Sequence, residues 1–146
     1  MKVLFLDIDG VLNTNKDLYE HGPTYINPYL IHFLKFIVLS TNASIVLSSS
    51  WRLFDEAKKI VEENLYIKKL HLLDTTPHMI KKLSMWTPRS EEIGVWLTKH
   101  PQVKKFAILD DDLDAGEGFL ESFFQTDPEV GLTIDLAEEV VNHLNR

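Results

Sequence analysis

The sequence predicts an α/β fold, a three-layer α/β/α sandwich around a central parallel sheet. Short apolar runs that end at turn residues are typical of buried strands, and segments with helical spacing of apolar residues alternate with them. Parallel strands joined by right-handed crossovers follow from this alternation. At 146 residues the chain can bury a large core without disulfides or a structural metal. We therefore expect residues 1–146 to form a single domain.

The first half of the chain provides two strong strands and two helices. The apolar run at residues 2–8 ends in Asp-Ile-Asp-Gly, as a buried strand entering a turn does. Asn-Pro at positions 27–28 is a typical helix start, and the apolar spacing after it predicts a helix over 28–41. A second strand is expected at 43–47, before three serines. The remaining two predicted elements are a helix at 53–64 and, on a weaker pattern, a strand at 67–73.

The second half repeats the alternation. Thr87-Pro88 is again a cap followed by proline, so a helix is expected from there to a point before Pro101. The clearest later strand, at 104–109, continues into Asp110-Asp111-Asp112. A short strand near 123–126 and a helix at about 134–145 complete the predicted fold. Residues 13–26 and 74–86 remain as loops, which are too short for a folded cap domain.

Polar side chains follow three of the expected strands. In parallel α/β sheets, ligands bind beyond the carboxyl ends of the strands, so these side chains should meet at one edge. Asp-Gly is also a common turn, but a carboxylate that ends a buried strand is costly unless it is paired. The groups expected to converge are Asp7, Asp9, Ser48, Ser49, Asp110 and Asp111.

This set of residues favours Mg²⁺ and phosphate chemistry. Neighbouring carboxylates repel one another unless a cation joins them, and a site made only of oxygen ligands suits Mg²⁺. Serine hydroxyls can hold phosphoryl oxygens, and Arg89 at a helix start can offset phosphate charge. Arg52 could also contact phosphate, although an ion pair with Asp55 or Glu56 explains it equally well. Trp51 could stack on a base, but a core or lid aromatic is the favoured interpretation.

The motifs resemble those of the haloacid dehalogenase-like (HAD) phosphatase superfamily. The sequence Leu-Asp-Ile-Asp-Gly-Val-Leu at 6–12 resembles its first motif, Val-Leu-Ser at 46–48 its second, and Ile-Leu-Asp-Asp at 108–111 its fourth. Together with Ser-Ser-Ser-Trp-Arg, Thr-Pro-Arg and a late Gln-Thr-Asp-Pro-Glu-Val-Gly-Leu-Thr, the pattern is similar to the HAD domains of "Swiss Army knife" RNA-repair proteins.

The resemblance implies a role for each matching residue. Asp7 would be the nucleophile and a metal ligand, and Asp9 would be the general acid and base, with its backbone carbonyl on the metal. Ser48 would bind the phosphoryl group. Asp111 would complete the Mg²⁺ site, with Asp110 supporting or sharing that role, because the triple Asp leaves the register open by one residue.

The third motif departs from the family pattern, which usually offers a lysine. Arg89 is the best-placed cation, since it begins the helix that leads into the Asp110 strand, although a salt bridge to Glu91 or Glu92 would also account for it. Lys81 and Lys82 are the competing cations. Without a cap the site should be open, as suits a large substrate or one covered by a partner subunit.

These observations predict a Mg²⁺-dependent phosphomonoesterase that works through an aspartyl-phosphate, with a nucleotide or polynucleotide end among its substrates. One alternative is a phosphorylation switch like a receiver domain, which is also small, acidic and Mg²⁺-dependent. Receiver domains, however, carry adjacent acidic residues after their first strand and an acceptor aspartate after a middle strand. Another alternative is a catalytically idle phosphate-binding module, which would gain little from so many carboxylates.

Composition excludes several other functions. The net charge of −7 argues against an extended groove that binds nucleic acid, but not against binding of the single phosphate at a nucleic-acid end. The sequence has no cysteine, so thiol catalysis and cysteine-based metal sites are excluded. No apolar run approaches the ~20 residues of a membrane span, and the first residues do not form a signal peptide. We expect a cytoplasmic protein.

Overall fold

The computed structural model describes residues 1–79 and 87–146, and within them it contains a five-stranded parallel sheet. The strands are β1 (Lys2–Leu6), β2 (Ser44–Leu47), β3 (Leu72–Thr75), β4 (Lys105–Asp110) and β5 (Phe123–Gln125). The α-helices are α1 (Asn15–His21), α2 (Pro28–Thr41), α3 (Asp55–Ile67), α4 (Arg89–Thr98) and α5 (Ile134–Leu144). Short 3₁₀ turns form η1 (Ser50–Leu53), η2 (Leu113–Gly116) and η3 (Leu120–Ser122).

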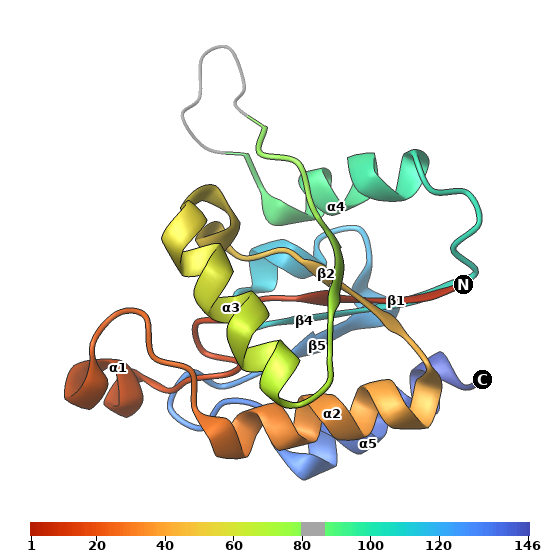
Figure 1. Ribbon diagram of the computed structural model, residues 1–146. Coiled ribbons are helices and arrows are strands. Elements are labelled where there is room, and N and C mark those ends of the chain that lie inside the picture. The colour runs from red at the N-terminus through yellow and green to blue at the C-terminus, as the bar shows by residue number, and fades with distance from the viewer. Residues whose placement is uncertain (80–86) are drawn as a thin grey trace.

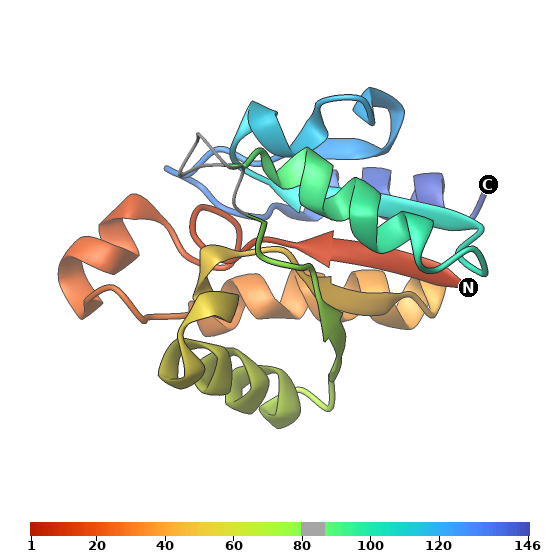
Figure 2. The ribbon, with the colours of Figure 1, turned by 90° about the horizontal axis from the view of Figure 1, so that it is seen from above.

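Helices cover both faces of the sheet, which gives the three layers that the sequence predicts. Figures 1 and 2 show α2 and α5 on the opposite side of the sheet from α4. The buried apolar side chains of α2, α3 and α5 form one cluster with one face of the sheet, whereas those of α4 and η2 form a second cluster with the other face. The described residues contain no cap domain, and none of the described helices has the length and apolarity to cross a membrane.

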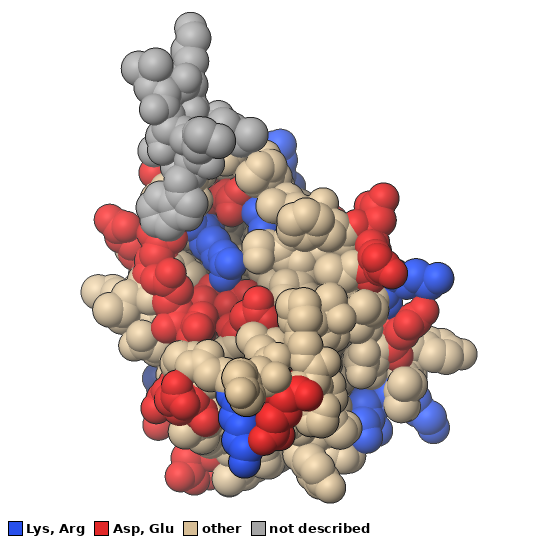
Figure 3. Space-filling view, turned by 90° about the vertical axis from the view of Figure 1, so that its left-hand side faces the viewer, with Lys and Arg blue, Asp and Glu red and all other residues tan. Residues whose placement is uncertain are grey.

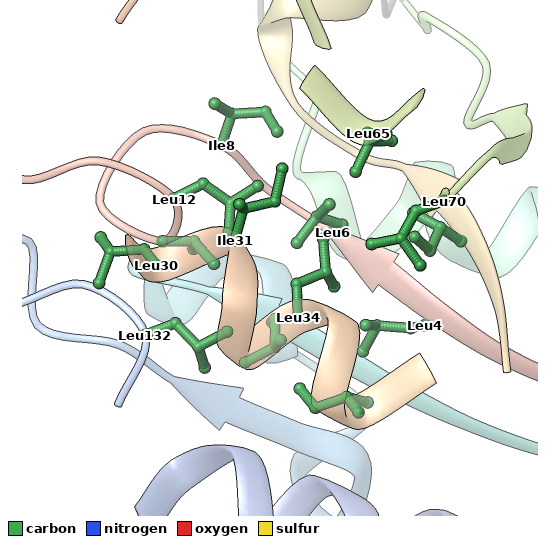
Figure 4. Packing of buried hydrophobic residues seen from close by; sticks show 14 of the residues in the cluster. Leu4, Leu6, Ile8, Leu12, Leu30, Ile31, Leu34, Leu65, Leu70 and Leu132 are labelled. Carbon is green, nitrogen blue, oxygen red and sulfur yellow. The ribbon is translucent and has the colours of Figure 1, made fainter. Parts of the chain in front are cut away.

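The central strand is apolar on both faces because both are covered. Residues 3–6 of β1 have no solvent exposure, and their side chains divide between the two clusters. Figure 4 shows Leu4 and Leu6 facing Ile31 and Leu34 of α2, with Leu65 of α3 nearby. A continuous apolar strand is therefore explained by burial in a parallel sheet, where alternation is not required.

The strand order β3-β2-β1-β4-β5 places a topological switch point between β1 and β4. The chain leaves β1 toward β2 on one side, and it returns from β3 across the sheet to β4 on the other. In open α/β sheets ligands bind in the crevice at such a point, outside the carboxyl ends of the strands. The residues that follow β1 and β4 therefore lie where this fold class binds its ligands.

Local sequence signals placed most elements correctly. Helix α2 has the predicted bounds, and the Asn27 side chain caps it by accepting a hydrogen bond from the Tyr29 backbone N–H at 2.9 Å. The expectation that residues 13–26 form only a loop is wrong, because α1 lies within them. Thr14 and Asp17 form a reciprocal capping box at its start. The Thr-x-x-Asp spacing was therefore a local signal for this helix.

Two further predictions need correction. Helix α3 continues to Ile67, and Lys69 follows in the left-handed region at φ 61°, so the third strand starts at Leu72, five residues later than predicted. Thr87 does not cap α4. Pro88 occupies the cap position, and the Arg89 backbone N–H instead donates to the Asp114 carboxylate at 3.2 Å. The η2 turn therefore supplies the cap. Its Asp114 lies 25 residues after the start of α4, so no pattern of neighbouring residues could indicate it.

Candidate active site

Three carboxylates from two strands meet at the switch point. Asp7 directly follows β1, Asp110 ends β4, and Asp111 comes next, and each offers an oxygen within 4.8 Å of the others. The sheet ladder fixes this position, since the Asp7 backbone N–H donates to the Leu109 carbonyl at 3.0 Å. Figure 3 looks onto the edge where the strands end and shows acidic side chains gathered there, with basic ones beside them. The convergence expected from sequence thus occurs for these three residues.

Arg89 lies within the carboxylate cluster and holds two of its members. Its Nη1 is 3.0 Å from Asp7 Oδ1 and 3.0 Å from Asp110 Oδ2, and both carboxylates are almost fully buried. Burial, followed by repulsion from Asp110, raises the pKa of Asp7 well above its ordinary value, although Arg89 opposes this. Burial alone would lower the pKa of Arg89, but Asp7 and Asp110 raise it. The cluster is therefore rich in negative charge that one guanidinium only partly offsets.

Asp111 is the most open of the three carboxylates. Its side chain is partly exposed, whereas Asp110 is buried and also accepts a hydrogen bond from the Asp112 backbone N–H at 3.0 Å. Burial and the contact with Asp110 raise the pKa of Asp111 to about 6. Gly10, at φ 78°, packs against it so closely that a Cβ there would collide with the Asp111 carboxylate. The glycine of the first motif is thus required both by its backbone conformation and by this close approach.

The donor set fits a hard divalent cation. Three carboxylates in reach of one another, with raised proton affinity for Asp7 and Asp111, form the kind of site that Mg²⁺ occupies with a few protein oxygens and several waters. Both Asp110 and Asp111 reach the cluster. The sequence left open which of the two belongs to the fourth motif, and the structure brings both adjacent residues to the site.

The Asp9 carboxylate is hydrogen-bonded to two side chains outside the carboxylate cluster. No sequence pattern predicted these two contacts. The Trp51 indole Nε1 donates to Asp9 Oδ2 at 3.1 Å, and Asn13 Nδ2 donates to Asp9 Oδ1 at 3.0 Å. Trp51 is only 5% exposed, so it is a core aromatic, as favoured, and it also orients Asp9. Asn13 further accepts from the Gly10 backbone N–H at 3.0 Å. Only the position of Asn13 directly after the first motif could have signalled this role.

The serines after β2 differ in their environments. The Ser48 backbone N–H continues the ladder by donating to the Leu6 carbonyl at 2.8 Å, which places Ser48 at the same edge of the sheet as Asp7. Among the described residues its buried hydroxyl has no hydrogen-bond partner, and the same holds for the Thr87 hydroxyl. The Ser49 hydroxyl accepts from the Trp51 backbone N–H at 3.1 Å and caps η1. A buried hydroxyl without a partner is unusual and indicates a place for a polar ligand.

Arg52 differs from both expectations for it. It makes no surface ion pair with Asp55 or Glu56; instead its guanidinium is buried and 2.9 Å from Glu92 Oε1, with both side chains 5% exposed. It also donates to the carbonyls of Thr76 and Ser49 at 3.0 and 2.7 Å. Its donors are therefore engaged by protein, which does not favour the expected contact with phosphate. This pairing links η1 with α4 across 40 residues, and no local pattern could indicate it.

Arg89 occupies the position expected for the third-motif cation, at the start of α4 and against Asp7 and Asp110. Lys81 and Lys82, the alternatives considered from the sequence, lie outside the described residues. Of the eight predicted site residues, Asp7, Asp110 and Asp111 form the carboxylate cluster, and Arg89 contacts the first two. Asp9 and Ser48 lie at the same edge, whereas Ser49 and Arg52 are engaged by other protein groups.

Comparison with known proteins supports the resemblance drawn from the motifs. A search of curated proteins finds no match to the sequence. A family model described as the HAD domain in Swiss Army Knife RNA repair proteins matches residues 3–137, which include all three strands that end at the site and the helix that carries Arg89. The chain therefore belongs to the family of HAD domains in Swiss Army Knife RNA repair proteins.

Proposed function

We propose that this chain is a Mg²⁺-dependent phosphomonoesterase, acting as a single domain, with Asp7 as its nucleophile. The observation that carries the proposal is the meeting of Asp7, Asp110 and Asp111 beside Arg89 at the switch point of the sheet. Family membership adds support, since hydrolysis of phosphate esters is typical of HAD domains. A structural role alone would not explain three carboxylates in contact, because their repulsion destabilises the fold.

Mg²⁺ would be held by Asp7 and Asp111, with Asp110 sharing or supporting that role and the Asp9 backbone carbonyl as a further ligand. The bound cation would neutralise charge on the phosphoryl oxygens, which is its main contribution in phosphoryl transfer. Arg89 would supply a second, fixed positive charge beside the same group. The partly exposed Asp111 is suited to ligation because fewer protein groups compete for its oxygens.

The protein side chains divide the remaining chemistry. An Asp7 carboxylate oxygen attacks phosphorus, the bond from phosphorus to the leaving oxygen breaks, and that oxygen takes a proton from the Asp9 carboxyl group. Water then attacks the aspartyl-phosphate and gives its proton to Asp9. The bond from phosphorus to Asp7 breaks, which releases phosphate and restores both aspartates. Trp51 and Asn13 orient Asp9 for its two proton transfers.

The Ser48 hydroxyl would donate a hydrogen bond to a phosphoryl oxygen. It is buried at the sheet edge and lacks a partner among the described residues, so a bound phosphoryl group would satisfy it. The Thr87 hydroxyl is also buried and unpartnered, two residues before Arg89. In the sequence, Thr87 has the pattern of a helix cap, which gives no sign of such a role.

A phosphorylated nucleic-acid end is the substrate class we propose. The description of the family refers to RNA repair, and the absence of a cap domain in the described residues leaves the site accessible to a large substrate. The two alternative functions find less support. The strand order differs from the 2-1-3-4-5 order of receiver-like folds, and an idle phosphate-binding module would gain nothing from the buried carboxylate cluster.

The test is release of phosphate from phosphorylated oligonucleotides and nucleotides in Mg²⁺ and in EDTA. Asp7→Asn should abolish turnover while circular dichroism and thermal unfolding show a folded protein. Asp135→Asn, in the exposed first turn of α5, is the matched control and should behave as wild type. Turnover by Asp7→Asn at the wild-type rate would refute the nucleophile, and a stable phosphoprotein without turnover would favour the switch.

Ser48→Ala separates a binding role from a structural one. Because the hydroxyl has no partner to lose, removing it should leave thermal stability unchanged or slightly higher. If the hydroxyl donates to the transferring group, kcat/KM should fall about 100-fold, the scale of one lost donor in a transition state. A large loss of stability with no effect on kcat/KM would show that the hydroxyl is structural.

A further inference from the structure

A cavity of about 340 Å³ opens beside Asp9. Its walls come from two segments: Pro23 and Thr24 in the loop between α1 and α2, and η1 with the first turn of α3, which contribute Trp51, Phe54 and Glu56. Asp9 is the point where the cavity meets the proposed catalytic site. The group that occupies this cavity would therefore be adjacent to the carboxyl group that protonates the leaving oxygen.

The walls of the cavity favour a flat, uncharged occupant. The side chain of Phe54 is 65% exposed, but its backbone is held in place. The Phe54 backbone N–H donates to the Trp51 carbonyl at 3.2 Å, and Phe54 is the N-cap residue of α3. An exposed ring on an ordered backbone is a ready surface for stacking. The lining contains two carboxylates, those of Asp9 and Glu56, and no lysine or arginine. A group with its own negative charge would be repelled there.

We propose that this cavity is the leaving-group subsite and that it binds the nucleoside attached to the scissile phosphate, with the base stacked on Phe54. The inference rests on the proposed function, because the role of Asp9 sets which side of the phosphate the cavity serves. The phenol of a phosphotyrosine would be another flat, uncharged leaving group. A nucleoside fits the cavity better than this phenol for two reasons. The volume is that of a small-molecule site, about 300 Å³ or more, and Thr24 and Glu56 offer hydrogen-bonding partners for sugar hydroxyls and base edges.

The test compares the wild-type chain with Phe54→Ala, Phe54→Tyr and a control variant, Tyr66→Ala. Tyr66 is 72% exposed on the same helix and lies outside the cavity. Values of kcat/KM are measured in Mg²⁺ for nucleoside monophosphates, oligonucleotides with a 3′- or 5′-phosphate, glycerol phosphate and a phosphotyrosine peptide. The mononucleotide and oligonucleotide arms distinguish a free nucleotide from a strand end as the source of the nucleoside.

Phe54→Ala should lower the ratio of kcat/KM for nucleoside esters to that for glycerol phosphate about tenfold, through a higher KM. Phe54→Tyr should restore the ratio, and Tyr66→Ala should not change it. An equal loss on glycerol phosphate would overturn the proposal, as would a selective loss on the phosphotyrosine peptide.

A binding measurement separates this proposal from the proposed function. Adenosine, an uncharged nucleoside, is titrated into each protein and followed by NMR chemical shifts without any turnover. Saturable binding to wild type that weakens about tenfold in Phe54→Ala supports the subsite even if every ester resists hydrolysis. Equal adenosine shifts in wild type and Phe54→Ala, or none in either, would overturn the subsite whether or not the enzyme is active.

Discussion

Replacement of Asp111 by asparagine should stabilise the metal-free protein at neutral pH. Burial and Asp110 raise the pKa of Asp111 from its ordinary 3.8 to about 6, so the folded chain holds this proton more tightly than the unfolded chain does. The resulting stability is fully present below pH 3.8 and is lost as the pH rises through 6. At pH 7.5 the wild type has lost it, and asparagine, which carries no charge, avoids the loss.

The expected magnitude follows from that pKa. A difference of about two pH units between folded and unfolded chains corresponds to about 3 kcal/mol, and solvent screening of this partly exposed carboxylate reduces it to about 1 kcal/mol. For a chain of this size, that amounts to a rise in Tm of about 3 °C. Asp111→Asn in EDTA should therefore unfold about 3 °C above wild type at pH 7.5 and at the same temperature as wild type near pH 3.5.

The assay is thermal unfolding by circular dichroism across this pH range, in EDTA and again with Mg²⁺. Mg²⁺ should raise the Tm of wild type at pH 7.5, because it binds the folded state and relieves the same repulsion, and should raise that of Asp111→Asn less. A wild type that is more stable than Asp111→Asn in EDTA at pH 7.5 would refute this reasoning, as would a gap between them that does not change with pH.

Three further predictions concern the close contact at Gly10, the buried ion pair of Arg52 and the hydrophobic core. Gly10→Ala should displace the Asp111 carboxylate, so it should weaken the Mg²⁺-dependent rise in Tm, whereas Gly22→Ala, at a glycine with similar φ but open space around it, should retain that rise. Glu92→Gln should lower the free energy of unfolding in urea by about 3 kcal/mol, because it leaves the Arg52 guanidinium buried without its counter-ion; a loss below 1 kcal/mol would mean that the pair is well solvated. Leu34→Ala should cost about 3 kcal/mol in the same assay, and a cost like that of an exposed site would show that α2 is not packed on the sheet.

The sequence predicted the parts of the fold that depend on local patterns. The strands at 2–8 and 104–109 were recognisable because both faces of the sheet are covered, which leaves continuous apolar runs. The Asn27 cap and the helix behind it follow from neighbouring residues alone. Because the carboxyl ends of parallel strands meet at one edge of the sheet, the residues that follow each strand were enough to place Asp7, Asp110 and Asp111 together.

Several errors arise where the partner of a residue is distant in sequence, whereas α1 was missed although its capping box is local. The cap of α4 comes from Asp114, 25 residues further along, and Arg52 pairs with Glu92, 40 residues away. Trp51 donates to Asp9 across 42 residues. No spacing rule links such positions, because only the folded sheet brings the loops after β1 and β2 together. The residues that orient the site are therefore harder to predict than the residues that form it.

The position of Arg89 bears on how the proposed Mg²⁺ site would work. Its guanidinium contacts carboxylates that follow or end two different strands, so the carboxylate cluster contains a counter-ion of its own and protein groups alone join the two strand ends. Binding and release of Mg²⁺ at the proposed site would then not require this edge of the sheet to come apart. A built-in counter-ion would also weaken the attraction for the cation, so occupancy would follow the concentration of the free ion.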